Sequence, residues 1–435
     1  MKSFVIRAEQ KNQWEGRSSI TPTHAKNLIA DLGIHLHFES SSKRCFDDQE
    51  YIDIGATLVK DISGQEIVVG VKEIPVELIS DKSKTYLFFS HTIKGQTENM
   101  PMLEKIIDAK STLIDYEKIT DQDQLRLVAF GYHAGVVGCV DSLWILGQKL
   151  KSQGVSNKFE DFKQSLSYSD IEKCRTHLRQ IGWEIAKTGF SDSGEPLVVA
   201  LLGEGKVSAG MQYILDCLPI RRYTPMEFLA NEDQLDDHEI HLVTFGPRHM
   251  VKKKDGTAYH REEYFSNPSL YESNFEKYYD KFNLILNAIF WTPENPVFIT
   301  QDMFETAFKN GNCPLVLGDV TCDINGSMQC TTKPSDPGNP CYTYHPITKE
   351  TPDGWDTDGV TVLAVDNLPC EFSSDASRDF GNAMYPFWES IANSDFSKPI
   401  EDCGFAPEIQ RATILYKGEL TKPYEYLQQF LKNRG

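Results

Sequence analysis

The sequence has no long apolar run and few cations for its size, and both features exclude classes of protein. No window of the 435 residues approaches the ~18 consecutive apolar residues that a membrane-spanning helix needs. Lys and Arg number 44 against 63 Asp and Glu, which gives a formal net charge of −19. A chain this acidic is a poor candidate for non-specific binding to nucleic acid or to an anionic membrane. A local basic pocket for a small anionic ligand stays compatible with this charge.

Several sequence signals of secretion, metal binding and catalysis are also missing. The ten Cys are scattered without a CxxC pair, which favours reduced thiols in a cytoplasmic protein. The start, MKSFVIRAEQ, is not typical of a secretory signal, although a mitochondrial matrix location stays open if a transit peptide has been removed. No GxSxG or P-loop occurs. No metal is expected, because no usual zinc module has the spacing of Cys313, Cys322, Cys330, Cys341 and His345.

The apolar pattern predicts a doubly wound α/β fold. A chain of this length exceeds one ordinary core and predicts two or three domains. Short, nearly continuous apolar runs alternate with helical stretches, which is typical of parallel strands covered on both faces. A helix is expected to begin at Pro22, with Thr21 as its cap. The strand candidates in this first part are 3–9, 35–40, 66–73, 85–91, 111–117 and 125–131.

A second α/β run follows two long helices. We expect these helices over 132–152 and 168–187. The stretch 319–360 is rich in Pro, Gly, Cys and Asp and predicts a long irregular loop, and helix is expected from 369 to the end. The strands of this second run are predicted at 196–203, 220–224, 239–246 and 361–369.

Ionisable residues stand where the predicted strands of the first part end. Ligands of open parallel sheets bind beyond the carboxyl ends of the strands. Lys72 and His91 both terminate runs that read as fully buried, and partial burial moves the pKa values of lysine and histidine toward neutrality. General acid–base chemistry needs such groups. The other ionisable residues at these ends are Arg7, Glu9, Glu73, Asp115 and Glu117, and Arg126 opens the next predicted strand.

A glycine turn opens the second α/β run. A buried strand leads into Gly203-x-Gly205 and then a helix, which is the context of a dinucleotide-binding turn. The pattern is G-x-G-x-x-S-x-G, with Ser208 where the third glycine is usual. About 20 residues on, where an acid indicates NAD, the chain has Arg221 and Arg222. These arginines either lie as a surface pair or favour NADP(H) over NAD(H), since a guanidinium suits a 2′-phosphate.

Several motifs together resemble one enzyme family. IRAEQKNQWEGRSSITPTH, VGVKEIP, FFSHTIKGQ, LIDYE, LVAFGYHAG, GEGKVSAG and VDNLP occur in that order. They resemble the lysine–2-oxoglutarate reductase family, the saccharopine-forming relatives of alanine dehydrogenase and the transhydrogenase α-subunit. The likeness is greatest to the reductase half of the bifunctional lysine-degrading enzyme, α-aminoadipic semialdehyde synthase. It implies two Rossmann-like domains with a cleft between them: a substrate domain of 1–140 plus 367–435 and a dinucleotide domain of 141–366.

The resemblance also implies roles for individual residues. It places the family's catalytic lysine on Lys72 and its histidine on His91. Arg17, which would otherwise count as a solvated loop residue like Glu15, becomes the substrate-anchoring arginine. The other substrate-binding positions are Glu73, Lys94, Glu117, Phe130, Ile289 and Phe290. The cofactor-binding positions are Gln96, Arg126, Gly203, Gly205, Lys206, Val207, Ser208, Arg221, Arg222, Asp319 and Asp366, where Asp366 could equally cap a helix.

The implied reaction joins lysine and 2-oxoglutarate with NADPH to form saccharopine, in lysine degradation. The two substrates carry three carboxylates, and Arg17, Lys94 and Arg126 are candidate counter-charges. Two alternatives stay open: an NAD-linked amino-acid dehydrogenase resembling alanine dehydrogenase, and a non-catalytic ligand-binding homologue. The expected partners are these small molecules, with no nucleic acid or membrane, and a homo-oligomer is not decided by the sequence.

Overall fold

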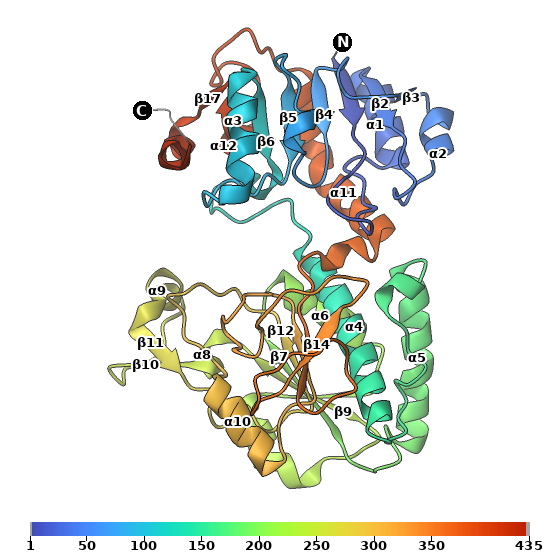
Figure 1. The fold of residues 1–435 in the computed structure, drawn as a ribbon, viewed down its shortest axis with the longest axis vertical. Helices are drawn as coiled ribbons and strands as arrows, with labels where there is room; N and C mark the ends of the chain where they lie inside the picture. Colours follow the sequence, from blue (N-terminus) through green and yellow to red (C-terminus); the bar gives the residue numbers. More distant parts are fainter. Residues whose placement is uncertain (1, 432–435) are drawn as a thin grey trace. The chain divides into compact units, whose positions relative to one another are not determined.

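A computed structural model describes residues 2–431. The chain divides into two compact units, one of residues 1–130 and 373–435 and the other of residues 131–372. Each unit is an open, mostly parallel sheet with helices on both faces (Figure 1). The predicted class, two Rossmann-like α/β domains, is confirmed. The assignment of a substrate role to one unit and a dinucleotide role to the other stays a prediction.

The sheet of the first unit has eight strands in the order β17-β16-β6-β5-β4-β1-β2-β3. Strands β1 to β6 run parallel, and β16 is antiparallel to β6. Helices α1 and α11 share a core with one face, and α3 shares a core with the other. The strands are β1 Ser3–Ile6, β2 His35–Glu39, β3 Thr57–Val59, β4 Ile67–Val69, β5 Thr85–Phe88, β6 Thr112–Asp115, β16 Thr413–Tyr416 and β17 Glu419–Leu420. The helices are α1 Pro22–Leu32, α2 Asp48–Asp53, α3 Met100–Asp108, α11 Ser373–Ala392 and α12 Pro407–Ala412.

The first helix follows local sequence signals closely. The Thr21 side chain accepts a hydrogen bond from the His24 amide, Pro22 stands at the first helical position, and Gly33 ends the helix with φ 60°. These are the residues that favour a helix start and a left-handed helix end. The predicted start of this helix is confirmed.

The second unit has seven strands in the order β14-β15-β13-β12-β7-β9-β8. Helices α4, α5 and α6 share one core with the sheet, and α7 and α10 share another. The strands are β7 Leu197–Leu202, β8 Ile220–Tyr223, β9 Ile240–Phe245, β12 Leu284–Asn287, β13 Val316–Asp319, β14 Cys341–Tyr344 and β15 Val360–Leu363. The helices are α4 Gly131–Ser152, α5 Ile171–Thr188, α6 Lys206–Leu215, α7 Pro225–Asn231 and α10 Gln301–Asn310. A separate segment holds α8 Pro247–Met250, α9 Arg261–Ser266 and the hairpin β10 Val251–Lys253 and β11 Tyr271–Ser273.

Three expectations from the sequence are wrong. Residues 125–131 form no strand but a single bridge from Arg126 to Thr120, because β16 already occupies the sheet edge beside β6. The 319–360 stretch is not wholly irregular, since it contains the buried strand β14 paired with β15. The chain after α11 is not all helix, because β16 and β17 return to the first sheet.

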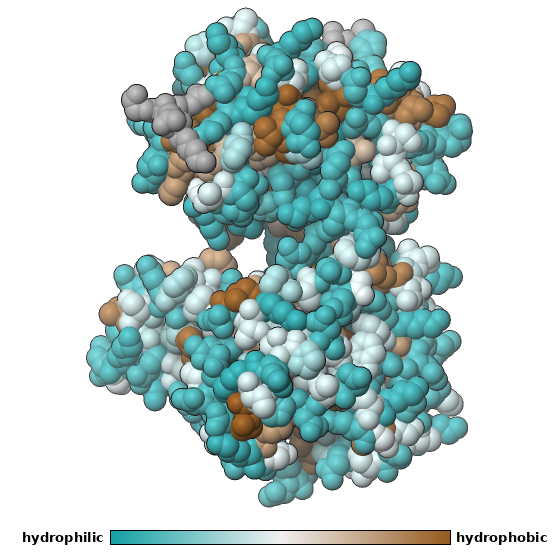
Figure 2. All heavy atoms as spheres, in the orientation of Figure 1, coloured by the Kyte–Doolittle hydropathy of each residue, from teal (hydrophilic) through white to brown (hydrophobic). Residues whose placement is uncertain are grey.

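The visible face of each unit is largely hydrophilic, with small hydrophobic patches (Figure 2). Among residues 2–431, no helix combines the length and the apolar composition needed to cross a membrane.

Two carboxyl groups are buried beside each other in the second unit. Asp141 lies in α4, where its Oδ1 accepts a hydrogen bond of 2.8 Å from the Ser165 amide. Burial raises the pKa of Asp141 to about 6, and burial together with the Asp141 carboxyl raises the pKa of Glu371 well above its usual range. Both folded pKa values exceed the unfolded ones. The stability that protonated Asp141 contributes is therefore fully present below about pH 4 and is lost as the pH rises through about 6.

We therefore expect Asp141→Asn to stabilise the protein more at pH 8 than at pH 5. The amide has the shape of a protonated carboxyl and can donate to Glu371 without ionising. The expected rise in melting temperature at pH 8 is about 2–4 °C, the shift that roughly 1 kcal/mol produces in a domain of this size. Asp192→Asn, at an exposed acid of the same unit, is the control. It should change the melting temperature by the same amount at pH 5 and at pH 8. An equal shift for Asp141→Asn would contradict the prediction.

Candidate functional site

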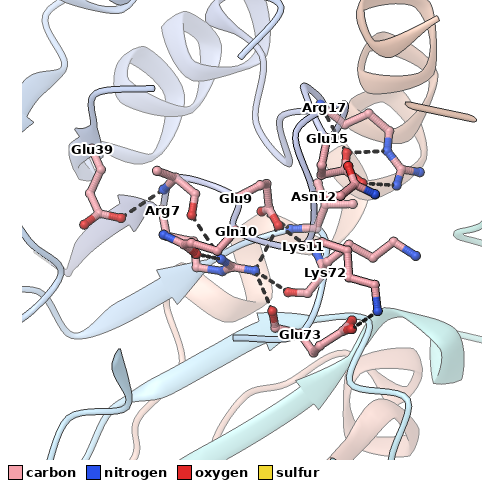
Figure 3. A network of polar contacts seen from close by, with 12 residues as sticks. Arg7, Glu9, Gln10, Lys11, Asn12, Glu15, Arg17, Glu39, Lys72 and Glu73 are labelled. Atoms are coloured by element: carbon pink, nitrogen blue, oxygen red, sulfur yellow. Dashed lines mark hydrogen bonds and ion pairs between the residues drawn. The ribbon is translucent and has the colours of Figure 1, made fainter. Parts of the chain in front are cut away.

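A polar network lies at the carboxyl ends of β1 and β4 in the first unit (Figure 3). The Glu9 carboxylate accepts hydrogen bonds from the amides of Val71, at 2.7 Å, and Lys72, at 3.1 Å. It also pairs with Arg7 at 2.9 Å, and both side chains are almost fully buried. Arg7 in turn donates to the carbonyls of Lys72 and Glu73. Hydrogen bonds to both amides and carbonyls therefore fix the backbone around Lys72.

Gly70 is required for this arrangement. A Cβ at Gly70 would lie 2.4 Å from the Arg7 Nε, so any side chain there would expel the guanidinium. The absence of a side chain at Gly70, the glycine of the V-G-V-K-E motif, thus leaves room for the Arg7 side chain at the end of β4.

The Lys72 side chain, on this fixed backbone, is half-buried. Burial lowers the pKa of Lys72, and the Arg17 guanidinium lowers it further, while Glu15 and Glu73 oppose the shift. A lowered pKa increases the neutral fraction of an amine at a given pH, which suits general acid–base chemistry. This direction is the one expected for a lysine at this strand end, and the catalytic role of Lys72 stays a prediction.

His91 and Glu73 form a pair beside Lys72. The His91 Nδ1 lies 3.1 Å from a Glu73 carboxylate oxygen, and Lys11 pairs with the other oxygen. Burial pushes the pKa of Glu73 upward, but the hydrogen bonds from His91 and Lys11 hold it well below its usual range. Glu73 therefore stays ionised and orients the imidazole, as carboxylates do for catalytic histidines.

The backbone at His91 is strained. Its φ is 49°, in the left-handed region that non-glycine residues seldom occupy. The Asn99 side chain donates to the His91 carbonyl at 3.1 Å and helps to hold this conformation. Such strain, often about 1–3 kcal/mol, concentrates at functional sites.

Arg17 is buried and already paired within its own loop. Its Nε and Nη2 lie 2.8 and 2.5 Å from the two carboxylate oxygens of Glu15, a bidentate ion pair. The guanidinium also lies over the Phe130 ring, 4.3 Å from its centroid, and Phe130 stacks on Phe380. Neither Arg17 nor Glu15 is solvated. A substrate carboxylate would have to share Arg17 with Glu15, so the anchoring role stays a prediction.

Four further predicted residues lie in loops of the same unit. Glu117 and Arg126 form an ion pair with each other. Lys94 is exposed, and its amide donates to the Gln96 side chain at 3.1 Å, so these two residues share one turn after β5. None of these contacts decides a ligand role.

The glycine turn of the second unit has the geometry of a close backbone approach. Gly203 has φ 111°, and a Cβ there would lie 2.6 Å from the Ala288 carbonyl oxygen. Gly205 has open space around it at the start of α6, which leaves room for a pyrophosphate at the helix N-terminus. Ser208 is fully buried. The close helix packing falls instead at Gly210, where a Cβ would lie 2.0 Å from the Tyr132 carbonyl oxygen.

A cavity of about 400 Å³ opens beside this turn, entirely within the second unit. Ile289 and Phe290, predicted to contact substrate, line it together with the turn. The 247–265 segment supplies a wall that the sequence analysis did not assign. Its only available signal was the aromatic and basic run AYHREEYF. The wall residues are Pro247, Met250, Arg261, Tyr264 and Phe265.

The arginine pair does not lie at this turn. Arg221 and Arg222 stand level with Val198 and Val199, before the carboxyl end of the sheet. Arg222 pairs with Asp216, at the end of α6 opposite to the turn, and Arg221 lies 3.8 Å from Glu239. Both arginines are exposed and lie in ion pairs, as in the surface alternative, and their assignment to a 2′-phosphate stays a prediction.

Asp319 is engaged within its own unit, and its predicted cofactor contact stays a prediction. It is buried, and it accepts hydrogen bonds from Asn287 at 2.9 Å and from Thr321 and Thr331 at 2.6 Å. Burial raises its pKa. Asp319 is a polar core residue, whereas Asp366 is exposed after β15. Within the described residues the ten cysteines are all free, and they gather into no group with metal-binding geometry.

Two domain models of one family match the chain. The sequence models for the N-terminal and C-terminal domains of "Alanine dehydrogenase/PNT" match residues 5–137 and 249–423. The chain belongs to the alanine dehydrogenase/PNT family. A solved structure titled "L-ALANINE DEHYDROGENASE" has the same fold, with a TM-score of 0.64 at 18% identity over 98% of each chain.

Within the alanine dehydrogenase/PNT family, the similar curated proteins agree with the predicted branch. "Alpha-aminoadipic semialdehyde synthase, mitochondrial" from Bos taurus is 31% identical over 99% of this chain and 48% of its own length. The Arabidopsis thaliana "Alpha-aminoadipic semialdehyde synthase" is 32% identical over 98% of this chain and 41% of its length. A Yarrowia lipolytica protein named "Saccharopine dehydrogenase [NAD(+), L-lysine-forming]" is 26% identical over 88% of this chain and 90% of its length. The chain spans about half the length of the Bos taurus protein and somewhat less of the Arabidopsis thaliana protein.

Proposed function

We propose that this chain is an oxidoreductase that condenses L-lysine reductively with 2-oxoglutarate to form saccharopine, with a nicotinamide dinucleotide as reductant. The observation that carries the proposal is the half-buried Lys72 beside the Glu73–His91 pair, all held at strand ends of the first unit. The names of the similar proteins support the substrate class. The glycine turn and its cavity support the dinucleotide.

The reaction needs proton transfers that Lys72 and His91 can perform. The ε-amine of the lysine substrate must lose a proton before its lone pair attacks the ketone carbon of 2-oxoglutarate. The resulting carbinolamine must gain a proton on its hydroxyl so that water leaves and an imine forms. We assign the main acid–base role to His91, oriented by Glu73, and assistance to Lys72. The dinucleotide, when bound, supplies the hydride that reduces the imine carbon.

Charge recognition of the substrates falls to the cations around this network. Arg17 can share its guanidinium between Glu15 and a substrate carboxylate, and Lys94 and Arg126 are further candidates. Glu73 or Glu117 can receive a substrate ammonium. The aromatic ring of Phe130 holds Arg17 by a cation–π contact. Gln96 lies on the same turn as Lys94.

The dinucleotide would be held by Gly203, Gly205, Lys206, Val207 and Ser208, at the turn and the start of α6. The sequence favoured NADP(H), through Arg221 and Arg222, and the ion pairs of those arginines do not support that choice. Asp366 keeps its predicted cofactor contact as a proposal.

A steady-state assay tests the proposed reaction. Purified protein with L-lysine and 2-oxoglutarate should oxidise NADH or NADPH and accumulate saccharopine, identified by mass spectrometry. Oxidation with pyruvate and ammonia in place of these substrates would instead favour an enzyme resembling alanine dehydrogenase. Dinucleotide binding without turnover on either substrate set would favour a non-catalytic homologue. No saccharopine with either cofactor rejects the proposal.

A further inference from the structure

A second cavity, of about 440 Å³, lies at the amino edge of the sheet in the first unit. Strands β5 and β6 begin there with Thr85 and Thr112, and β16, which is antiparallel to β6, ends there just before Lys417. Lys72 and His91 follow the other ends of β4 and β5, so this amino-edge cavity is separate from their network. Its volume falls within the range of about 300–1,000 Å³ that small-molecule sites have.

The lining of the amino-edge cavity is cationic, although the chain as a whole is acidic. Its lysines are Lys2, Lys84, Lys110 and Lys417, and Glu66 is the one acid among the described residues that line it. The formal net charge of the chain is −19, so composition does not explain a local excess of positive charge. Lysines held near one another repel, and an anion bound among them relieves that repulsion.

Two of these lysines already have partners within the unit. Lys84 donates to two backbone carbonyls of the loop before β4. Lys2 donates to the Ile391 carbonyl at 3.3 Å and to both the carbonyl and the hydroxyl of Ser394, which uses its three N–H groups. Burial lowers the pKa of Lys2 to about 8, although Glu66 opposes the shift. Lys2 and Lys84 therefore contribute mainly positive charge.

Lys110 and Lys417 are exposed and supply free donors. The Lys110 ammonium has no partner among residues 2–431, and the Lys417 ammonium has one hydrogen-bond acceptor, the Lys398 carbonyl at 3.2 Å. Their φ angles are 51° and 54°, in the left-handed region that non-glycine residues seldom occupy. A Cβ at Gly418 would lie 2.8 Å from the Lys110 Cα, so this glycine allows the two turns that carry the lysines to pack together.

Two buried threonines also line the amino-edge cavity. Thr85 and Thr112 are partners in the register of β5 and β6, so their side chains lie on the same face of the sheet. They are only 4% and 3% exposed. The Thr85 hydroxyl has no hydrogen-bond partner within residues 2–431, and the Thr112 Oγ1 accepts the Lys417 amide at 3.2 Å, which leaves its proton free to donate. Because buried polar groups normally have partners, these hydroxyls indicate a polar ligand.

We infer that the amino-edge cavity binds a small organic acid with at least two anionic groups, either carboxylates or phosphates. Lys110 and Lys417 neutralise these groups, and the hydroxyls of Thr85 and Thr112 donate hydrogen bonds to their oxygens. The ring of Phe396, which also lines the cavity, faces the carbon skeleton. The inference goes beyond the proposed reaction and does not depend on it, because the Lys72 network and the glycine turn lie elsewhere.

Calorimetric titration of the purified protein tests the inference, with succinate as the dicarboxylate probe and inorganic pyrophosphate as the phosphate probe. At least one probe should bind the wild type, and the probe that binds more tightly identifies the preferred anionic group. The double variant Lys110→Gln/Lys417→Gln should weaken that binding at least 10-fold, since it removes both ammonium groups. Thr85→Val, which keeps the shape of the side chain, should weaken it by about 10-fold, the effect of one hydrogen bond to a charged group.

Lys60→Gln is the matched control, because Lys60 is an exposed lysine of the same unit that does not line the cavity. It should leave the affinity within about twofold. Saccharopine formation without a probe should stay within about twofold in every variant, so a failure of the proposed reaction would be seen separately. Binding of neither probe to the wild type at about 10 mM overturns the inference. Equal affinity in the wild type and in the double variant also overturns it, since the anion then binds at another place.

Discussion

Lys72→Met and His91→Gln should each lower the turnover of saccharopine formation by roughly 10²–10⁴-fold, the contribution of a positioned acid–base group. Neither substitution should abolish substrate binding, because the predicted charge contacts with the substrates come from other side chains. The loss should therefore appear mainly in kcat, with a smaller change in KM.

The pH profile separates the two residues. Burial and Arg17 both lower the pKa of Lys72 from its ordinary value. Glu73 stays ionised under the same conditions, since His91 and Lys11 hold its pKa well below the usual range. The alkaline limb of the kcat profile should therefore move in Lys72→Met, and Glu73→Gln should alter the profile by releasing His91 from its partner.

Lys82→Met is the matched control for Lys72→Met, because Lys82 is an exposed lysine of the same unit. It should leave turnover within about twofold. A Lys72→Met enzyme with full turnover and an unmoved pH profile would remove Lys72 from the proton transfers. The same result for His91→Gln would transfer the main role to another group.

The residues of the network could be predicted from the sequence where strand order was simple. Lys72 and His91 follow two apolar runs, and because β4 and β5 are parallel neighbours, their carboxyl ends meet at one edge. The order of the strands in the second unit could not be predicted from the sequence. Arg221 and Arg222 lie in β8, the second strand of their unit, and the fingerprint rule assumes that this strand adjoins the first, whereas β9 intervenes.

The directions of individual side chains are the second feature that could not be predicted from the sequence. Asp319 is the last residue of β13, and Lys72 lies in the loop after β4, yet the Asp319 carboxylate turns into the core to meet Asn287 and Thr331. The Glu9 carboxylate accepts hydrogen bonds from the amides of Val71 and Lys72, which are 62 and 63 residues away in the sequence. Local pattern does not determine either direction, because each depends on contacts that exist only in the folded unit.

Glu9→Gln should be the substitution outside the reacting groups with the largest effect. Glu9 accepts the amides of Val71 and Lys72 and neutralises Arg7 in a buried site. A glutamine must turn its NH₂ toward one of these donors, and it leaves the Arg7 charge without a counter-ion. Breaking a buried pair in this way costs about 3–5 kcal/mol.

The activity of Glu9→Gln should also fall, by roughly 10–100-fold in kcat, because Lys72 loses its fixed position and small displacements at an active site are costly. Glu9 is a positioning residue in this interpretation, since it acts through the backbone of Lys72. The alkaline limb of the pH profile should therefore move, which a purely structural role would not cause.

Glu39→Gln provides the comparison for Glu9→Gln. Glu39 accepts the Ala8 amide at 2.9 Å and has no contact with the Lys72 backbone among the described hydrogen bonds. Its loss should cost about 1 kcal/mol of stability, the usual value of one hydrogen bond, and leave kcat and its pH profile unchanged. Urea unfolding and kcat–pH profiles of both variants distinguish a positioning role of Glu9 from a purely structural one. If Glu9→Gln loses stability but keeps the wild-type pH profile, Glu9 supports the fold alone and does not position the amine.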